Sequence, residues 1–454
     1  MNTVQSENNT AHAYRRQQSS FNQAIAALKK KQFSRAISLF RQGLPAEANN
    51  PNFIASYGSA LAGFGLHEQA EYWYQRGRAI APDHHALLIN SGNFYRKQGL
   101  FEEAQDCYQK LLQYHGKHKE HLMLMGMLWR DWQRPRQAIQ YFNQVRKLDD
   151  KHQNVQWELA RMHLELGDYQ NGFSLFDHRF FMPGFRKAVT DASLNGHLWQ
   201  GEPLDHKVLL VTHEQGFGDI LQFSRFIPLI KAKHIYWELP APLVRLFPSS
   251  ERLTIIQSGK SLATSDYHIP LMSLPRRLGI TLDNLPTPWN PLADYHPQKQ
   301  RNKIKVGLIW SGKPTPTDRS INIAKLLPHL SHPDASLFSF QVDKKKEAIE
   351  PFLQDGLITD LSSNINDFYD TARHMQRMDL IISVDTGPAH LAGILGIPAW
   401  ILVHYTSDWR WRTTGDRSPW YPNIHLFKQR QWNDWNPVLK QLRKAFLHLL
   451  PTKI

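Results

Sequence analysis

Four short segments of this 454-residue chain combine the residue types that a site for an anionic ligand needs. The first is HEQGFGD at residues 213–219, between a predicted buried strand at 208–211 and an amphipathic run at 220–231. Its glycines let backbone amides come close to a ligand, and the helix expected to begin near Ile220 adds N–H donors at its N-terminus. Asp219 ends the segment. It is either the N-cap of that helix or a carboxylate that accepts a proton from an attacking hydroxyl group.

A dinucleotide-binding fingerprint is the other chemistry that this glycine-containing turn suggests. It needs a third glycine three residues after Gly218, but Leu221 stands there. Glu238 does lie 20 residues beyond Gly218, where an acid that binds ribose would fall. Without the third glycine, the segment argues against a dehydrogenase.

The second segment is SVDTGPAHLA at residues 383–392, which begins inside a predicted buried strand at 380–384. Pro388 suits the first position of a helix, which would place the amides of Thr386 and Gly387 at the helix N-terminus. A diphosphate can accept hydrogen bonds from such amides without a metal ion, because the helix dipole offsets its charge. A well-capped turn from strand to helix is the alternative interpretation.

The remaining two segments add cations and aromatic rings after predicted strands. WSGK at residues 310–313 has Arg319 nearby, so Lys313 and Arg319 either meet phosphate charge or are solvated loop cations. SDWRW at 407–411 and SPWYP at 418–422 supply rings that either stack on a sugar or base or pack within the protein.

The elements in front of these segments repeat with a fixed period. Three blocks, 54–58, 88–92 and 122–126, each end in glycine, and each begins 34 residues after the last. An alanine follows each glycine by 12 residues, and an aromatic residue follows each alanine by four: Ala70 and Tyr74, Ala104 and Tyr108, Ala138 and Phe142. The pattern resembles the tetratricopeptide repeat, a stack of helix pairs in which the small residues allow close approach and the aromatic rings fill the core.

The second half of the chain alternates short β-rich runs with helical stretches. The predicted strands are residues 208–211, 234–238, 253–256, 304–310, 337–342, 380–384 and 399–403. Strands alternating with helices indicate parallel sheets. Two such series, joined by the Pro- and Asn-rich stretch 285–297, imply two Rossmann-like lobes that bind ligands at the carboxyl ends of their strands.

Composition sets limits on the kind of protein. A hydrophobic fraction of 41% with 21% charged residues is typical of a globular protein, and the formal charge of +14 favours anionic partners. No zinc-finger spacing or RNA-binding aromatic signature supports a nucleic-acid partner. The single cysteine, Cys107, excludes an intrachain disulfide and a thiolate metal site. No run of 18 apolar residues and no secretory signal is visible, so a cytoplasmic protein is expected.

Taken together, the four segments resemble a known enzyme family. Residues 204–449 are similar to the C-terminal region of bacterial tetratricopeptide-repeat proteins that carry a family-9-type, heptosyltransferase-like glycosyltransferase domain. The segments that carry the resemblance are EQGFGD at 214–219, VGLIWSG at 306–312, VDTGPAHLAG at 384–393 and DWRWR at 408–412. The resemblance implies an α + α/β chain, in which a helical solenoid precedes a GT-B pair of Rossmann-like lobes, and an enzyme that needs no metal or cofactor.

The resemblance also implies roles for single residues. Asp219 matches the aspartate proposed as catalytic base in heptosyltransferases. The donor-binding residues of the family match five residues of the segment 383–392 and two of the segment 310–313: Asp385, Thr386, Gly387, Pro388 and His390, together with Ser311 and Lys313. The spacing around Lys313 departs from the family pattern, and the first lobe, at 207–297, is short for an enzyme that binds a lipopolysaccharide acceptor.

The predicted organisation and function follow from these observations. We expect a disordered N-terminus at 1–16, repeats at 17–182, a linker at 183–205, an acceptor-side lobe at 206–300 and a nucleotide-sugar lobe at 301–454. The expected reaction moves a sugar from a nucleotide diphosphate sugar to a protein presented by the repeats, as in flagellin-modifying enzymes of similar layout. Two alternatives stay open: transfer in surface-polysaccharide or lipopolysaccharide assembly, and a catalytically silent scaffold.

Overall fold

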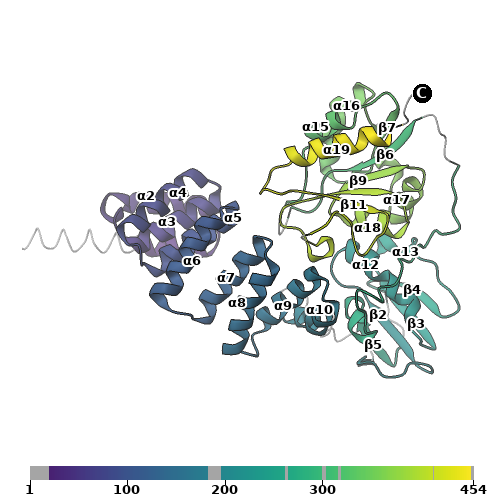
Figure 1. Ribbon diagram of the computed structural model, residues 1–454, viewed down its shortest axis with the longest axis horizontal. Helices are drawn as coiled ribbons and strands as arrows, with labels where there is room; N and C mark the ends of the chain where they lie inside the picture. The colour runs from purple at the N-terminus through teal and green to yellow at the C-terminus, as the bar shows by residue number, and fades with distance from the viewer. Residues whose placement is uncertain are drawn as a thin grey trace, which may run out of the picture. The chain divides into compact units, whose positions relative to one another are not determined.

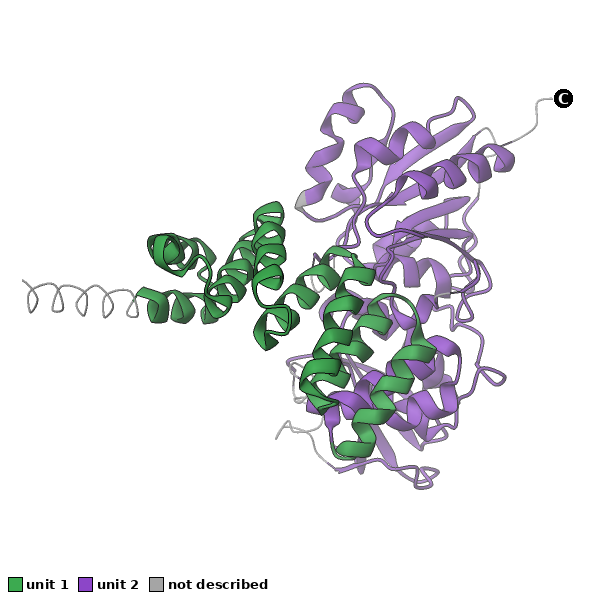
Figure 2. Cartoon of the chain, turned by 60° about the vertical axis from the view of Figure 1, so that its left-hand side comes forward, with its two compact units in different colours: residues 1–151 green, residues 152–454 purple. Residues whose placement is uncertain are grey.

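The computed structural model describes residues 20–182, 196–260, 264–298, 303–314, 318–412 and 414–450. The predicted disordered segment 1–16 and residues 183–195 of the predicted linker lie outside these described residues. The chain forms two compact units, Met1–Lys151 and His152–Ile454 (Figure 2).

The first unit is built of helices alone in its described part. Residues 20–29 are helical, and seven further helices follow (Figure 1): α2 (Phe33–Glu47), α3 (Pro51–Phe64), α4 (His67–Ile80), α5 (His85–Gln98), α6 (Phe101–His115), α7 (Lys119–Asp131) and α8 (Pro135–Leu148). Gly65 and Gly99 end α3 and α5 with φ of 94° and 78°, a left-handed conformation that glycine adopts without strain. Both glycines lie at the turns between the paired helices.

Each predicted small residue lies against the predicted aromatic ring of its own repeat. A Cβ atom at Gly58 would lie 2.6 Å from Cε1 of Tyr74, and Gly92 and Gly126 pack in the same way against Tyr108 and Phe142. All three rings are buried. The prediction that these rings form the core of a helical-repeat solenoid is therefore confirmed.

The repeat pattern continues into the second unit, whose first elements are α9 (Gln153–Leu166), α10 (Tyr169–Phe176) and the 3-10 helix η1 (Asp177–Phe181). These helices pack on the α/β part of their own unit. The ring of Tyr169 stacks on Trp420 with centroids 5.4 Å apart, and Phe173 meets the edge of Phe223 at 6.4 Å.

The first sheet of this unit has five strands in the order β1-β5-β2-β3-β4, and every pair is parallel. The strands are β1 (His197–Leu198), β2 (Val208–Thr212), β3 (His234–Leu239), β4 (Leu253–Gln257) and β5 (Tyr267–Pro270). The sequence predicted β2, β3 and β4 but not the other two.

The second sheet has six strands in the order β11-β10-β9-β6-β7-β8, again all parallel. They are β6 (Ile304–Ile309), β7 (Ala335–Ser339), β8 (Thr359–Asp360), β9 (Leu380–Val384), β10 (Ala399–Val403) and β11 (Ile424–Lys428). The prediction of parallel sheets is confirmed. The strand expected at 337–342 is displaced by about half its length, because the chain leaves the sheet after Ser339.

The connecting helices are short. The α-helices are α12 (Phe217–Phe223), α13 (Ala241–Val244), α14 (Leu274–Arg277), α15 (Ile323–Leu326), α16 (Glu350–Gln354), α17 (Phe368–Met375), α18 (Gly387–Ile394) and α19 (Asn436–Leu449). The 3-10 helices are η2 (Ser224–Leu229), η3 (Leu271–Ser273), η4 (Leu327–His329), η5 (Lys344–Ile349), η6 (Ser362–Asn364) and η7 (Trp409–Trp411). The helix predicted over 220–231 is wrong in extent: α12 begins three residues earlier, and the chain tightens to 3-10 geometry from Ser224.

Alternation along the strands of the second sheet buries both of its faces. On β10, Ile401 and Val403 belong to one apolar cluster, which also includes α10 and the first sheet, while Leu402 belongs to another that includes α19. Polar segments at the strand ends are therefore held on a rigid support. Across the described ranges, no helix is long and apolar enough to cross a membrane.

Candidate functional site

The turn between β2 and α12 holds the carboxylate of Asp219 at the start of a helix. Gly216 is the N-cap of α12, in an extended conformation, and Asp219 is the third helical residue. The backbone N–H of Gly216 donates to Oδ2 of Asp219 at 2.9 Å. The N-cap alternative for Asp219 is therefore wrong in position: the side chain caps the helix from inside the first turn.

A buried arginine from the other sheet contacts the same carboxylate. Arg410, which lies in η7 after β10, donates from Nη2 to Oδ1 of Asp219 at 2.5 Å and from Nη1 to Oδ1 of Asp408 at 2.7 Å. Its Nε donates to Oε1 of Gln222. One cation thus bridges two carboxylates from the two sheets. Because it is fully satisfied, Arg410 can remain charged although only 8% of its side chain is exposed.

The surroundings of this ion pair shift the pKa values of both Asp219 and Arg410. Burial raises the pKa of Asp219, although Arg410 and the Gly216 N–H oppose the shift. Burial lowers the pKa of Arg410, but the carboxylates of Asp408 and Asp219 outweigh it and the net shift is upward. With 19% of its side chain exposed, Asp219 remains accessible to solvent. A partly accessible carboxylate with a raised pKa is a better proton acceptor than an ordinary aspartate.

The second predicted turn follows β9. Thr386 is the N-cap of α18, and its Oγ1 donates to the carbonyl of Val384 at 3.2 Å. Gly387 is the first helical residue and Pro388 the second, one position later than predicted. The N–H of Gly387 has no carbonyl within the helix to bond to, since first-turn amides lack such partners. Asp385 is buried, and the guanidinium of Arg319 forms an ion pair with its carboxylate.

The loop after β6 lies beside this turn, as adjacent parallel strands require. A Cβ atom at Gly312 would lie 2.8 Å from Cγ2 of Thr386. Ser311 is buried, and its N–H donates to Oε1 of Gln341 at 3.2 Å, so that amide is already used. Lys313 is exposed and makes no hydrogen bond or ion pair within the part of the chain that the structure describes.

The two turns, one from each sheet, meet at their helix N-termini. A Cβ atom at Gly218 would lie 2.7 Å from Cδ2 of His390, and one at Gly387 would lie 3.5 Å from Cβ of Phe217. The rings of Phe217 and Phe368 are in edge contact, with centroids 5.1 Å apart. The structure thus brings the segments of Asp219 and Gly387 together, although they lie more than 160 residues apart in the sequence.

His390 lies behind this contact. Its Nδ1 is 2.9 Å from the hydroxyl of Tyr421, and its ring lies 5.1 Å from that of Trp411. Burial, followed by the charge of Arg410, lowers the pKa of His390 to about 3, so the ring is neutral at neutral pH. Its contacts are those of a packing residue that supports both turns.

The aromatic segments near the C-terminus pack inside the protein. Trp409, Trp411, Trp420 and Tyr421 are all buried, and Trp409 contacts Trp420 edge to face at 5.7 Å. The interpretation of these rings as packing residues is therefore the one that the structure favours over stacking on a sugar. Arg410, between Trp409 and Trp411, contacts Asp219, and the sequence does not predict this contact although Arg410 lies within the segment 407–411.

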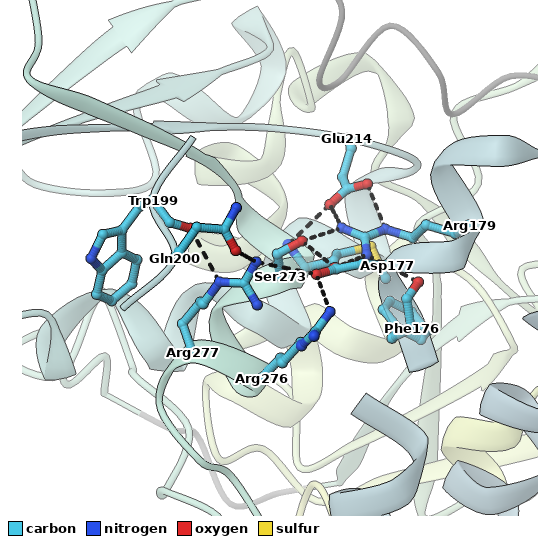
Figure 3. A network of polar contacts seen from close by, with 10 residues as sticks. Phe176, Asp177, Arg179, Trp199, Gln200, Glu214, Ser273, Arg276 and Arg277 are labelled. Atoms are coloured by element: carbon cyan, nitrogen blue, oxygen red, sulfur yellow. Dashed lines mark hydrogen bonds and ion pairs between the residues drawn. The ribbon is translucent and has the colours of Figure 1, made fainter. Parts of the chain in front are cut away.

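A second buried network fixes the start of the Asp219 turn (Figure 3). Arg179, in η1, has no exposed side-chain surface and donates two hydrogen bonds to Glu214, at 2.6 and 2.9 Å. It also donates to Oδ1 of Asp177 at 2.8 Å and to Oγ of Ser273 at 2.9 Å. The backbone N–H of Met272 donates to Glu214 as well, at 3.1 Å. The last helices of the repeat pattern thus hold the loop that leads to Asp219, and no local sequence signal marks Arg179.

Comparisons with known proteins bear on the repeats. Two tetratricopeptide-repeat family models match, one at residues 85–116 and one at residues 130–177. Protein FlbA of Caulobacter vibrioides is 25% identical over 337 residues, which cover 64% of this chain and 54% of FlbA. The chain therefore spans about half the length of the curated relative that it matches.

The solved structures that the chain resembles include three that each cover between a third and two fifths of it. A tetratricopeptide-repeat protein from Parabacteroides merdae is 20% identical with a TM-score of 0.33, and covers 37% of this chain and 67% of its own. PilF of Pseudomonas aeruginosa is 18% identical with a TM-score of 0.33, and the match covers 36% of this chain and 75% of PilF. MamA from Desulfovibrio magneticus is 15% identical with a TM-score of 0.33, and the match covers 39% of this chain and 97% of MamA. The two family models show that the chain carries tetratricopeptide repeats, and two parallel sheets with helices follow them.

Proposed function

We propose that this tetratricopeptide-repeat chain is a glycosyltransferase whose two parallel sheets form a GT-B pair of Rossmann-like lobes. It would move a sugar from a nucleotide diphosphate sugar to a protein acceptor in the cytoplasm. One observation carries the proposal: the turns after β2 and β9, at the carboxyl ends of strands in two different sheets, meet with Asp219 and the N-terminus of α18 side by side. Ligands of parallel sheets bind beyond the carboxyl ends of the strands.

The donor would bind on the second sheet. The N–H groups of Thr386 and Gly387 at the start of α18 would donate to the diphosphate, aided by the helix dipole. Arg319 and Lys313 would supply positive charge from the neighbouring loop. These donors would stabilise the charge that grows on the nucleoside diphosphate as it leaves.

Asp219 would act as the base. The acceptor hydroxyl would give its proton to Asp219 as its oxygen bonds to the anomeric carbon, and the bond from that carbon to the diphosphate oxygen would break. Each carboxylate oxygen of Asp219 already accepts one hydrogen bond, from Arg410 or Gly216. An ionised carboxylate has about four acceptor positions, so a substrate hydroxyl can still be accommodated.

The repeats support a protein acceptor, because solenoids of this kind offer an extended surface for a polypeptide partner. Repeats also serve scaffolds, and a silent scaffold is the second candidate function. The scaffold is favoured by the ion pairs that Arg410 and Arg319 already make with Asp219 and Asp385, because these contacts occupy groups that would have to meet the substrates. Donor binding separates the two candidates.

Calorimetric titration of the full chain with nucleoside diphosphates and nucleotide sugars, without added metal, tests the proposal. We expect micromolar binding of one nucleotide, lost in Thr386→Trp and kept in the control Ser331→Trp, which alters an exposed residue on the same half of the chain. Asp219→Asn should keep donor binding and lose transfer. No binding of any nucleotide would leave the scaffold, and full turnover in Asp219→Asn would refute the assignment of the base.

A further inference from the structure

Four histidine rings gather at one end of three helices in the first unit. Ring centroids lie 5.0 Å apart for His85 and His115, 5.2 Å for His85 and His121, and 5.3 Å for His118 and His121. We propose that His85 and His121 form the core of a binding site for a divalent transition-metal ion such as Zn²⁺. The site lies within the repeats and is independent of the proposed transfer reaction.

The helix ends explain how residues distant in sequence converge. His85 is the first residue of α5, His115 the last of α6 and His121 the third of α7, while His118 is the N-cap of α7. Because α5 and α6 run antiparallel as a repeat pair, the start of one lies near the end of the other. The short connection after Gly116 then begins α7 at the same corner.

The repeat shows that His121 departs from the apolar residue type found at its position in the other repeats. Residues 34 apart occupy equivalent positions, and the third residue of each corresponding helix is Phe53 in α3, Leu87 in α5 and Val155 in α9. All three are apolar and buried, whereas α7 has His121 at this position, with 4% exposure. Burying an imidazole where the fold accepts Leu or Val costs free energy unless its nitrogens have partners.

The partners of His121 leave one nitrogen directed at His85. Its Nδ1 lies 2.9 Å from the carbonyl of Gly116, which can only accept, so Nδ1 carries the proton and Nε2 presents a lone pair. Nε2 of His85 lies 3.1 Å from that atom. A histidine that binds a metal through one nitrogen usually donates the other N–H to a carbonyl or carboxylate.

The separation of the two nitrogens suits chelation. With zinc–nitrogen bonds of about 2.0–2.1 Å, two ligands of a tetrahedral ion lie about 3.3 Å apart, close to the 3.1 Å between these two Nε2 atoms. His85 is exposed, so its ring can turn to share an ion. Imidazole nitrogen suits Zn²⁺, Ni²⁺ and Cu²⁺ better than Mg²⁺ or Ca²⁺.

The remaining ligands would be water and a third histidine. Among the residues that the structure describes, no three His, Cys, Asp or Glu side chains are already arranged to hold an ion. His115 donates from Nε2 to the carbonyl of Asp83 at 2.6 Å, which leaves Nδ1 as a lone pair within the cluster. The ring centroid of His115 lies 5.0 Å from that of His85, so we expect His115 to supply a third ligand once its ring turns.

Zinc titration of the chelator-treated full-length protein tests the site. We expect one equivalent bound with micromolar or better affinity in wild type, weakened at least about 10-fold in His85→Asn and in His121→Leu. His121→Leu installs the residue of the equivalent position in α5, so it should fold; circular dichroism and thermal unfolding check this. His206→Asn, which removes an exposed histidine of the second unit, is the matched control and should bind as wild type does.

Zinc should also raise the unfolding temperature of wild type and of His206→Asn but not that of His121→Leu. Substitution of Co²⁺ should give the visible absorption of a nitrogen-ligated ion in wild type and in His206→Asn, and should lose it in His85→Asn and His121→Leu at the same Co²⁺ concentration. Equal zinc affinity in wild type, His85→Asn and His121→Leu would overturn the proposal, because the surface histidines would then account for all binding. Absence of binding in wild type would overturn it as well.

Discussion

Replacing Gly218 by alanine tests the contact between the two helix N-termini. The helix itself should gain stability from the alanine, whereas the contact with the other turn should make the same change destabilising. Gly218 is a helical residue of α12, so alanine fits its backbone and should stabilise the helix by about 0.5–1 kcal/mol. The new Cβ atom would, however, lie 2.7 Å from Cδ2 of His390, closer than such atoms can come.

The imidazole cannot move away cheaply. His390 is buried, its Nδ1 is 2.9 Å from the Tyr421 hydroxyl, and its ring lies against Trp411. Overpacking of this kind costs about 1–3 kcal/mol. After subtraction of the helical gain, we expect Gly218→Ala to lower the free energy of unfolding of the second unit by up to about 2.5 kcal/mol, with a central value of about 1 kcal/mol.

Urea unfolding followed by tryptophan fluorescence measures this change, since eleven of the fourteen tryptophans follow residue 151. The comparison is a double-mutant cycle with His390→Ala, which removes the obstructing ring. In that background Gly218→Ala should become neutral or stabilising. A stabilising effect of Gly218→Ala in the wild-type background would refute the contact between the two turns.

Three further predictions concern other parts of the chain. Arg179→Met leaves Glu214 buried without its bidentate partner and should lower the free energy of unfolding by about 3–5 kcal/mol; a loss below about 1 kcal/mol in urea unfolding would contradict the network. The pKa of His390 is lowered from its ordinary value of 6.5 to about 3, so its neutral form contributes stability in full above pH 6.5 and loses it as the pH falls toward 3. The urea midpoint should therefore fall from pH 7 to pH 5, and fall less in His390→Gln. Burial raises the pKa of the Cys107 thiol, so Ellman's reagent should label it only on unfolding, and rapid labelling of the native protein would show an accessible thiol.

The sequence predicted the features that repeat or alternate locally. Tyr74 and Gly58 recur with a 34-residue period, so a single comparison along the chain identifies both the helices and their packing. The buried strands β9 and β10 are runs of five apolar or small residues and were predicted from composition alone. The strands that the sequence does not predict are β1 and β8, with two residues each, β5, which ends in Pro270, and the edge strand β11, which carries His425 and Lys428.

The polar contacts of the candidate site could not be predicted in this way. Arg410 and Asp219 are separated by 191 residues, and Arg179 and Glu214 by 35, and neither pair belongs to the pattern of glycine, alanine and aromatic residues that repeats along the chain. Their pairing depends on where two sheets and a helix pair place their ends in space. The sequence could identify the turn that carries Asp219 and the loop that carries Arg410, but not that one would neutralise the other.

An internal repeat allows equivalent positions to be compared within one chain. Where the residue type at one position differs from that in the other repeats, the surroundings of that residue differ as well. Position 164 is one example: Arg96 and Arg130 occupy the equivalent positions in α5 and α7, and both pair with Asp131, whereas Leu164 in α9 is buried in the apolar cluster of the second unit. The bulk of that leucine has a consequence eight residues later. Gly172 replaces the repeat alanine, and a Cβ atom there would lie 2.6 Å from Cδ2 of Leu164. The two differences are therefore linked. Leucine replaces arginine at position 164, where the side chain packs in the apolar cluster, and glycine replaces alanine at position 172 because a Cβ atom there would collide with that leucine.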